Sequence, residues 1–374
     1  MRAIPPDPAR AGTPYEAVSD EDFGDWGWQQ RNRIESLEAL EALLRLTEEE
    51  RQGFIGAAPR FRFAISPYYA LLADPQDPAC PIRLQVVPRP EEHTVQLGER
   101  SDPLGEEELE AAPNLIHRYP DRALLLTTDR CPVYCRFCTR RRIVGRIERQ
   151  APRALLSEAF EYVRAHPEIK EVILSGGDAL MLADAQLDYI LRELRAIAHV
   201  DIIRVASRMP VTCPMRVTPA LAEVLARYAP VYLMTHFNHP RECTRSAWEA
   251  CARLVDRGVV IKNQTVLLRG INDRTEIIAE LNRNLVAMRV DPHYLHQCDL
   301  AEGIEHFRTP LAVGLSIIDG LRGHMSGLAV PQFVVDVPGG LGKVTLQPEW
   351  VTSRQGRITT FRTYTGRTAE YYDP

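Results

Sequence analysis

Three cysteines fall within a short stretch of this sequence, at Cys131, Cys135 and Cys138. The stretch reads TTDRCPVYCRFCTRRR over residues 127–142, and the remaining cysteines of the chain are scattered singly. Zinc usually takes four ligands that come as two close pairs. Three thiolates instead suit a four-iron cluster in which one iron stays open. A zinc knuckle or buried free thiols are the alternative explanations.

The segments that must position these cysteines alternate between strand-like and helix-like patterns. Short apolar runs rich in β-branched residues begin near residues 122, 171, 201, 231, 260 and 293. Helix-like stretches lie between them, over residues 185–198, 218–229 and 274–288. This alternation favours repeated βα units around a parallel sheet. The pattern predicts six units, which is fewer than the eight of a closed barrel.

Polar residues follow the ends of these predicted strands. They are Cys131–Cys138, Ser175-Gly176-Gly177-Asp178, Ser207-Arg208, His236 with Asn238, Gln264 and Asp299. Each group alone is a weak signal, since a glycine pair after a strand is usually only a turn. In parallel α/β architectures, however, reactive residues gather where strands emerge into loops. The sequence therefore predicts one site on one rim of the sheet.

Two further segments flank this predicted core of residues 111–325. Residues 1–110 are polar and punctuated by proline, with a helical stretch at 36–54, and predict an N-terminal helical extension. We expect that extension to be a lead-in and not a catalytic unit. Residues 326–374 predict a β-rich C-terminal segment that contains the glycine-rich stretch QFVVDVPGGLGK.

The composition excludes several classes of protein. The chain has 374 residues, of which 45% are hydrophobic and 25% charged, as in an ordinary globular protein. A net charge of −5 gives no reason to expect nucleic acid as a partner. No apolar run approaches the roughly 20 residues of a membrane span, and the proline-rich N-terminus does not read as a signal peptide. We expect a cytoplasmic protein without a membrane partner, whose cysteines are thiols or metal ligands.

The C-x3-C-x2-C spacing, with Phe137 just before the last cysteine, resembles the radical S-adenosylmethionine enzymes. The resemblance implies a partial barrel of six βα units. It also implies a [4Fe-4S] cluster on Cys131, Cys135 and Cys138 that binds S-adenosylmethionine and cleaves it to a 5′-deoxyadenosyl radical. Phe137 would pack near the adenine, and the motif at 175–178 would hold the methionyl amino group. The expected contacts of this cofactor are therefore Phe137, Ser175, Gly176, Gly177, Asp178, Ser207, Arg208, His236 and Gln264.

A second reactive group is Lys343, at the end of DVPGGLGK. A Walker loop is excluded, because Val337 stands where that motif needs glycine and Val344 follows the lysine in place of Ser or Thr. A lone loop lysine is ordinarily solvated. Beside a radical-generating cluster, it suggests a lysine that forms a Schiff base with pyridoxal phosphate, which stabilises radicals.

Longer stretches resemble the lysine 2,3-aminomutase family. They are HRYPDRALLLTTDRCPVYCRFCTRRR, LSGGDAL, THFNHP, NQTVLLRGIND, CDLAEGIEHFRTP, GLRGHMSG and FVVDVPGGLGK. The resemblance covers roughly residues 20–365. It implies an isomerase that exchanges an amino group between Cα and Cβ of an amino acid, with S-adenosylmethionine and pyridoxal phosphate as coenzymes.

Carried over residue by residue, the resemblance implies roles for the remaining positions. Lys343 is the catalytic residue that carries pyridoxal phosphate, and Arg140 pairs with the substrate carboxylate. Asp299 and Asp336 hold the distal ammonium of a free cationic amino acid. The expected contacts of pyridoxal phosphate are Arg118, Tyr119 and Arg122. An arginine fork suits a carboxylate, and two converging aspartates would repel each other without a cation between them.

The resemblance further implies an electron donor such as flavodoxin or ferredoxin, and a homo-oligomer. Some family members carry a cysteine-rich C-terminal tail that binds zinc. This chain has no cysteine after Cys298, and Arg274 stands where such members have a cysteine, so we expect no structural zinc.

Three hypotheses about function follow. The first is conversion of L-lysine to β-lysine, and the second is the same mechanism on arginine, ornithine or glutamate. The third is a non-catalytic iron–sulfur or zinc-binding protein that has kept the fold. Lys343 and the polar rim argue against the third hypothesis. Two aspartates in the substrate site disfavour glutamate.

Overall fold

The main sheet of the molecule contains ten strands that follow one another in sequence order. The computed structural model describes residues 4–57 and 61–374, and the sheet runs from β1 to β10. Strands β3 to β8 are parallel to one another. They match the six predicted strands, with bounds β3 Arg122–Thr128, β4 Glu171–Gly176, β5 Ile202–Ala206, β6 Val231–Thr235, β7 Val260–Leu267 and β8 Asp291–Gln297. The predicted α/β fold is thereby confirmed.

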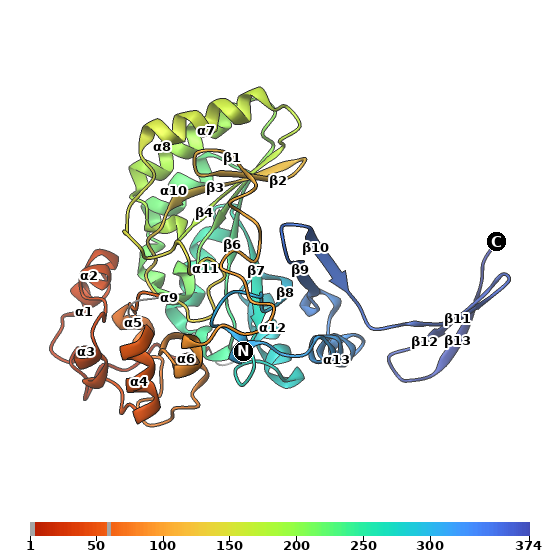
Figure 1. The fold of residues 1–374 in the computed structure, drawn as a ribbon, viewed down its shortest axis with the longest axis horizontal. Coiled ribbons are helices and arrows are strands. Elements are labelled where there is room, and N and C mark those ends of the chain that lie inside the picture. Colours follow the sequence, from red (N-terminus) through yellow and green to blue (C-terminus); the bar gives the residue numbers. More distant parts are fainter. Residues whose placement is uncertain (1–3, 58–60) are drawn as a thin grey trace.

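Helices follow these strands and cover one face of the sheet (Figure 1). They are α7 Arg153–Ala165, α8 Asp184–Arg195, α9 Met209–Thr212, α10 Pro219–Arg227, α11 Arg245–Val255, α12 Thr275–Ala287 and α13 Leu311–Leu321. Helix α8 shows why they pack there, since Leu187, Ile190, Leu191 and Leu194 recur on one side and are all buried. They belong to the same core cluster as the sheet residues Val172, Leu174, Ile203 and Val205. Across residues 4–57 and 61–374, no helix combines the length and apolar character needed to cross a membrane.

The C-terminal segment adds a seventh parallel strand to the sheet. Strand β9 (Gln332–Val337) pairs with β8, and β10 (Gly342–Leu346) returns antiparallel to β9. Gly339 and Gly340 in the intervening turn have φ values of 78° and 76°, which glycine adopts without steric cost. Lys343 lies directly opposite Asp336 in this register. Lys343 therefore lies on a strand, not in a loop.

The opposite edge of the sheet is a hairpin of β1 (Glu110–Ala112) and β2 (Leu115–Tyr119), antiparallel to β3. Short helices precede it: α1 Asp20–Phe23, α2 Trp26–Arg31, α3 Leu37–Glu41, α4 Glu48–Ala57, α5 Pro67–Ala70 and α6 Pro81–Val86. The predicted helical stretch at 36–54 is thus split into two helices. Thr47 and Glu50 explain the break, because Glu50 N donates to Thr47 Oγ1 at 3.2 Å and Thr47 N donates to Glu50 Oε2 at 2.8 Å. This reciprocal cap starts a new helix.

Short 3₁₀ turns connect the larger elements. They are η1 Pro90–His93, η2 Ala179–Met181, η3 Pro214–Arg216, η4 Pro240–Glu242, η5 Glu305–Phe307 and η6 Gly327–Ala329. Two of them, η1 and η4, contribute acidic side chains near the cluster loop.

The last strands form a separate antiparallel sheet. Its strands are β11 Val351–Gln355, β12 Ile358–Arg362 and β13 Thr368–Tyr372. Figure 1 shows this sheet projecting away from the body, with the C-terminus at its far end. All residues of β13 are exposed. Arg362 Nη2, which lies 2.9 Å from Asp319 Oδ1 of α13, ties the sheet to the body.

Candidate active site

The three predicted cluster ligands follow β3 in one loop and face one cavity. Cys131, Cys135 and Cys138 line this cavity of about 290 Å³, and none of the three is in a disulfide. Burial raises the pKa of Cys138 to about 11, so its thiolate needs a cation beside it, which cluster irons supply. In the described part of the chain, no three His, Cys, Asp or Glu side chains lie close enough together to bind one metal ion jointly. A four-iron cluster is compatible with this spacing, because each thiolate binds a different iron.

The N-terminal segment holds the cluster loop from one side. Tyr134 N donates to Ala64 O at 3.0 Å, and Arg136 N donates to Gln85 O at 2.9 Å. The side chain of Arg136 is completely buried and pairs with Glu92 of η1 at 2.6 Å. The segment that the sequence predicts as a lead-in therefore also contacts the cluster loop directly. Its contacts fix the backbone that presents the cysteines.

The motif Ser175-Gly176-Gly177-Asp178 packs closely against the cluster loop. Gly177 N donates to Thr128 O at 2.6 Å, and Asp178 N donates to Arg130 O at 2.8 Å. A Cβ on Gly177 would lie 2.3 Å from Arg130 O, so a larger residue would displace the loop. The cavity wall contains the whole motif, Ser175, Gly176, Gly177 and Asp178.

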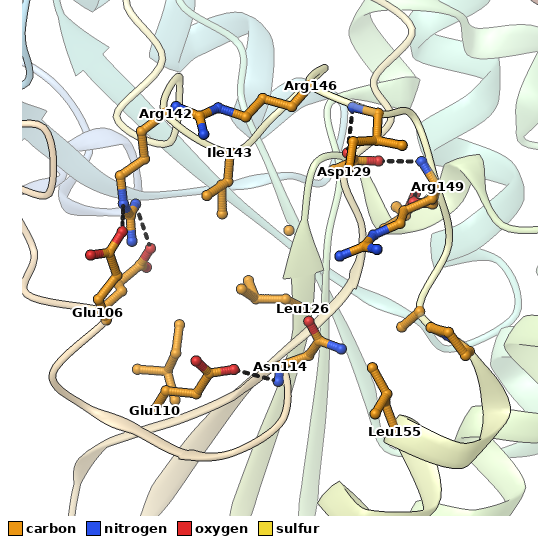
Figure 2. A pocket seen from close by; sticks show the side chains of 17 residues that line it. Glu106, Glu110, Asn114, Leu126, Asp129, Arg142, Ile143, Arg146, Arg149 and Leu155 are labelled. Carbon is orange, nitrogen blue, oxygen red and sulfur yellow. Dashed lines mark hydrogen bonds and ion pairs between the residues drawn. The ribbon is translucent and has the colours of Figure 1, made fainter.

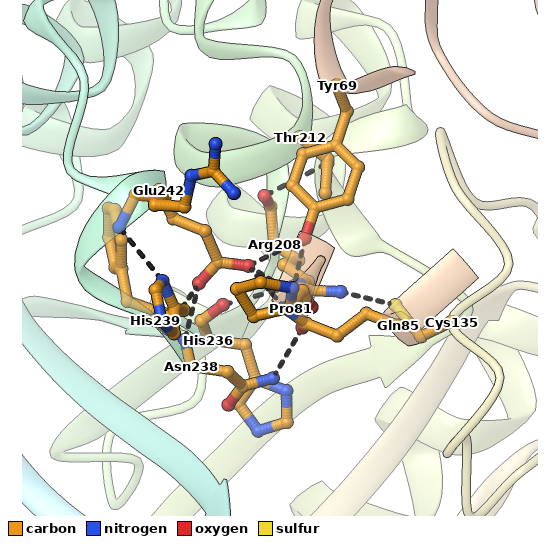
Figure 3. A network of polar contacts seen from close by, with 12 residues as sticks. Tyr69, Pro81, Gln85, Cys135, Arg208, Thr212, His236, Asn238, His239 and Glu242 are labelled. Carbon is orange, nitrogen blue, oxygen red and sulfur yellow. Dashed lines mark hydrogen bonds and ion pairs between the residues drawn. The ribbon is translucent and has the colours of Figure 1, made fainter. Parts of the chain in front are cut away.

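Residues that follow β5 and β6 complete this side of the cavity, together with Phe137 of the cluster loop and Gln264. Gln264 lies within β7, not after its end as the sequence pattern predicted. The wall includes Phe137, Ser207, Arg208, His236 and Gln264, all of which were predicted to contact S-adenosylmethionine. Figure 3 shows the Arg208 guanidinium within a buried polar network. Its Nη1 donates to Cys135 Sγ at 2.7 Å and its Nε to His236 O at 3.1 Å. Burial and the Arg208 cation lower the pKa of His236 to about 3, so this ring is neutral.

Arg140 lines the same cavity but is already paired with an acid. Glu106 accepts hydrogen bonds from Arg140 Nε at 2.9 Å and from Nη2 at 2.7 Å. The remaining terminal nitrogen, Nη1, donates to Ser175 Oγ at 3.0 Å. Glu106 thus holds the Nε–Nη2 edge of the guanidinium, and Ser175 accepts from Nη1.

Asp299 and Asp336 meet in the cavity, and their carboxyl groups differ in pKa. Lys343 Nζ lies 2.5 Å from Asp336, and Arg118 Nη1 lies 3.4 Å from it. Although burial opposes ionisation, a hydrogen bond with His296 and the Lys343 ammonium hold the pKa of Asp336 well below its usual value. Burial and the Asp336 carboxylate raise the pKa of Asp299 to about 6. Two such carboxylates favour a cation between them.

The predicted coenzyme contacts on β2 and β3 lie beside Lys343. Tyr119 Oη accepts a hydrogen bond from Lys343 N at 3.0 Å, and Arg118 Nε donates to Gly340 O at 3.0 Å. Arg118 Nη2 is buried and has no hydrogen-bond partner among the described residues. Leaving such a donor unpaired is costly, so the site fits a phosphate oxygen. Arg122 lies over the ring of Tyr119, 4.0 Å from its centroid, and does not reach the lysine through any contact in the described residues.

Several residues of the site were not found from the sequence. His296 lies on β8 near its carboxyl end and lines the cavity, and that position is the signal that could have indicated it. Glu106 belongs to an acidic run that reads as solvated surface. Tyr69, Gln85 and Glu242 reach the site from distant parts of the chain, and no motif marks them.

A second cavity of about 290 Å³ adjoins the first one (Figure 2). Its wall includes Arg142, Arg146 and Arg149 from the segment after the cysteines, together with Glu106, which pairs with Arg142 at 3.5 Å. Of the predicted site residues, Gly176 alone lines it. We therefore assign the chemistry to the first cavity.

Comparison with known proteins identifies the family of the chain. Residues 318–374 match the family described as Lysine-2,3-aminomutase, and residues 125–281 match the Radical SAM superfamily. The chain is 48% identical over 360 residues to L-lysine 2,3-aminomutase of Clostridium subterminale, which covers 96% of this chain and 86% of that one. The corresponding protein of Fusobacterium nucleatum is also 48% identical, over 96% of this chain and 85% of its own.

A relative with a different name is more distant. Glutamate 2,3-aminomutase of Clostridioides difficile is 39% identical over 95% of this chain and 84% of its own. The Radical SAM match implies S-adenosylmethionine and a [4Fe-4S] cluster as cofactors. The chain belongs to the lysine 2,3-aminomutase family of radical S-adenosylmethionine enzymes, which are isomerases.

Proposed function

We propose that this enzyme converts L-lysine to β-lysine by moving the α-amino group to Cβ, with pyridoxal phosphate bound to Lys343. The proposal is narrower than the family, because relatives named for lysine and for glutamate both match the chain. The choice between these substrates depends on the charges in the cavity.

One observation carries the choice of lysine: Asp336 already holds an ε-ammonium group. Lys343 Nζ lies 2.5 Å from Asp336, whose side chain is 5% exposed. A lysine substrate offers the same group to the same carboxylate, with Asp299 as a second partner. A glutamate side chain would instead add a third carboxylate to a buried pair, which repulsion disfavours.

Arg140 supports the other end of the substrate. Because Glu106 fixes the Nε and Nη2 edge, the guanidinium has a defined direction. A forked donor that is held in this way suits the α-carboxylate of an amino acid. Arg140, Asp299 and Asp336 line one cavity, so the ends of the substrate are held at the same time.

The buried Nη2 of Arg118 supports pyridoxal phosphate as the coenzyme. A phosphate oxygen would give this donor the partner that it lacks in the described residues. Tyr119 Oη fixes the backbone N–H of Lys343 and so orients the lysine. When bound, pyridoxal phosphate supplies a π system that stabilises a radical, while the cluster and S-adenosylmethionine supply the initiating radical. A reductant such as flavodoxin or ferredoxin would deliver the electron, and a homo-oligomer stays a prediction.

An anaerobic assay against a panel of amino acids tests the substrate. The reconstituted enzyme should hold about four irons per chain and convert lysine to β-lysine with a higher kcat/KM than arginine, ornithine or glutamate. Better turnover of arginine or ornithine would keep the cation site but make lysine the wrong substrate. Turnover of glutamate would contradict the role of the two aspartates.

Borohydride trapping tests the coenzyme site separately. The reagent should fix pyridoxal phosphate covalently on Lys343, and Lys343→Ala should lose the label while keeping its iron. The cluster is expected to persist because the cysteines lie on a different segment from the lysine. A label on Lys262 or Lys170 would refute the assignment.

A further inference from the structure

Arg208 joins the N-terminal segment, the barrel and a cluster cysteine through one guanidinium (Figure 3). Its Nη1 donates to Cys135 Sγ at 2.7 Å. Its Nη2 donates to Tyr69 Oη at 3.0 Å, to Gln85 Oε1 at 2.5 Å and to Glu242 Oε1 at 2.7 Å. These three partners lie on α5, α6 and η4. One side of the guanidinium is therefore held by three separate elements while the other side faces sulfur.

The carboxylate at the centre of this network is itself fixed. Glu242 is completely buried, and its Oε1 also accepts from Tyr69 Oη at 2.6 Å and from Gln85 Nε2 at 3.2 Å. Its Oε2 accepts from the backbone N–H groups of Asn238 at 2.5 Å and His239 at 3.0 Å. With both oxygens engaged, Glu242 cannot turn without breaking several bonds. The fold therefore sets the direction in which Arg208 points.

We propose that this network positions Arg208 as a cationic hydrogen-bond donor to the Cys135 thiolate and thereby raises the reduction potential of the bound cluster. Hydrogen bonds to the sulfurs are among the factors that set cluster potentials. A cationic donor stabilises the reduced cluster more than the oxidised one, because the reduced cluster carries one more negative charge. Tyr69, Gln85 and Glu242 are then positioning residues that act through Arg208. The inference deepens the proposed function, since it rests on Cys135 as a cluster ligand.

The two charges of the network have opposite expected effects. Arg208→Gln removes the cation, so the ratio of reduced to oxidised cluster at a fixed potential should fall about tenfold, which is a shift of about 59 mV for one electron. Glu242→Gln keeps the shape but removes the countercharge, so the ratio should rise. Tyr69→Phe loosens the guanidinium and should lower the ratio by less than Arg208→Gln. Arg208→Lys keeps the charge and should recover part of the loss.

The measurement is a redox titration of the reconstituted protein followed by electron paramagnetic resonance, without S-adenosylmethionine. Leaving that cofactor out matters, because Arg208 is also a predicted contact for it. Arg83→Gln is the matched control, since Arg83 and Glu50 form another completely buried ion pair, and Arg83 lies on the same helix as Gln85. This control should lower stability without shifting the potential. Iron content is measured for every variant.

The outcomes separate this inference from the proposed function. Shifts of opposite sign for Arg208→Gln and Glu242→Gln, with none for Arg83→Gln, would support it. If the two shifts are absent or share one sign while the variants keep their iron, the inference is overturned and the proposed function stands. If Arg208→Gln binds no iron, the other two variants decide. A rise in the ratio for Glu242→Gln with a fall for Tyr69→Phe would support the inference, and absent shifts or shifts of one sign would overturn it. A wild-type protein that assembles no cluster would overturn both.

Discussion

The N-terminal segment and the C-terminal three-stranded sheet both lie outside the parallel part of the main sheet, yet they relate to the site in opposite ways. The first reaches the cluster loop through Ala64, Gln85 and Glu92. The second projects away from the body (Figure 1), and its last strand is exposed throughout. Buried paired charges, and not position along the chain, therefore show which addition belongs to the site.

The largest expected effect is on the N-terminal side of this comparison. Glu92→Ala leaves Arg136 buried without its countercharge, which should lower the free energy of unfolding by about 3–5 kcal/mol. Because Arg136 N also holds the cluster loop, the variant should retain less iron per chain. Chemical unfolding and iron analysis would measure the two effects. Glu370→Ala on β13 is the control, and equal behaviour of the two variants would contradict the comparison.

The second prediction concerns the β9–β10 hairpin. Unlike the three-stranded sheet that follows it in the C-terminal segment, this hairpin lines the site. Asp336→Ala leaves the substrate ammonium underpaired, at a cost of about 3–5 kcal/mol for a buried pair. The kcat/KM for lysine should then fall by roughly two to four powers of ten, with iron content unchanged. A loss near tenfold or less would mean that Asp336 does not bind the side chain.

Asp299→Lys extends this prediction to specificity. It should repel lysine and favour an acidic substrate, because specificity needs repulsion as well as attraction. If the ratio of kcat/KM for lysine to that for glutamate stays unchanged, Asp299 does not contact the substrate side chain.

The third prediction concerns pH and is of intermediate size. Asp299 has a pKa raised to about 6, so it is neutral below that pH and binds an ammonium group only as pH rises through it. The kcat/KM for lysine should therefore increase with pH, by up to about tenfold per unit, and level off above about 6. Asp299→Asn should have a low kcat/KM that no longer rises with pH in this range. If the rise persists in Asp299→Asn, another group titrates.

The smallest expected effect is on the projecting sheet. Tyr371 and Tyr372 are 57% and 65% exposed, so replacing each with Ser should change the free energy of unfolding by no more than about 0.5 kcal/mol. Iron content and lysine turnover should match the wild type. A clear loss of either would show that another molecule covers this sheet in solution.

The core of the fold could be predicted because its signals are local. Most of the parallel strands are short runs that contain β-branched residues, and the polar residues at the strand ends meet on one rim, so the cysteines and Asp299 could be placed together. The break between α3 and α4 was also readable, since Thr47-x-x-Glu50 is a capping signature inside the predicted helix. The length of the apolar pattern concealed it.

The partners of the site arginines could not be predicted in this way. Glu106 meets Arg140 and Glu242 meets Arg208 only because the chain folds back on itself. An acidic residue in a charged run looks the same in sequence whether it is solvated or buried. Pairing of this kind depends on tertiary packing, for which a single sequence has no periodic signal.

The hairpin register has a consequence for how this enzyme can change over evolutionary time. Lys343 and Asp336 are cross-strand partners, so a one-residue insertion or deletion in the turn would move one of them to the opposite face. A Cβ on Gly340 would lie 2.8 Å from Leu109 Cδ1 and 3.0 Å from Leu104 O, so the turn also resists substitution. One-residue changes in length are therefore closed to this turn, and only changes of an even number of residues keep Lys343 and Asp336 on one face.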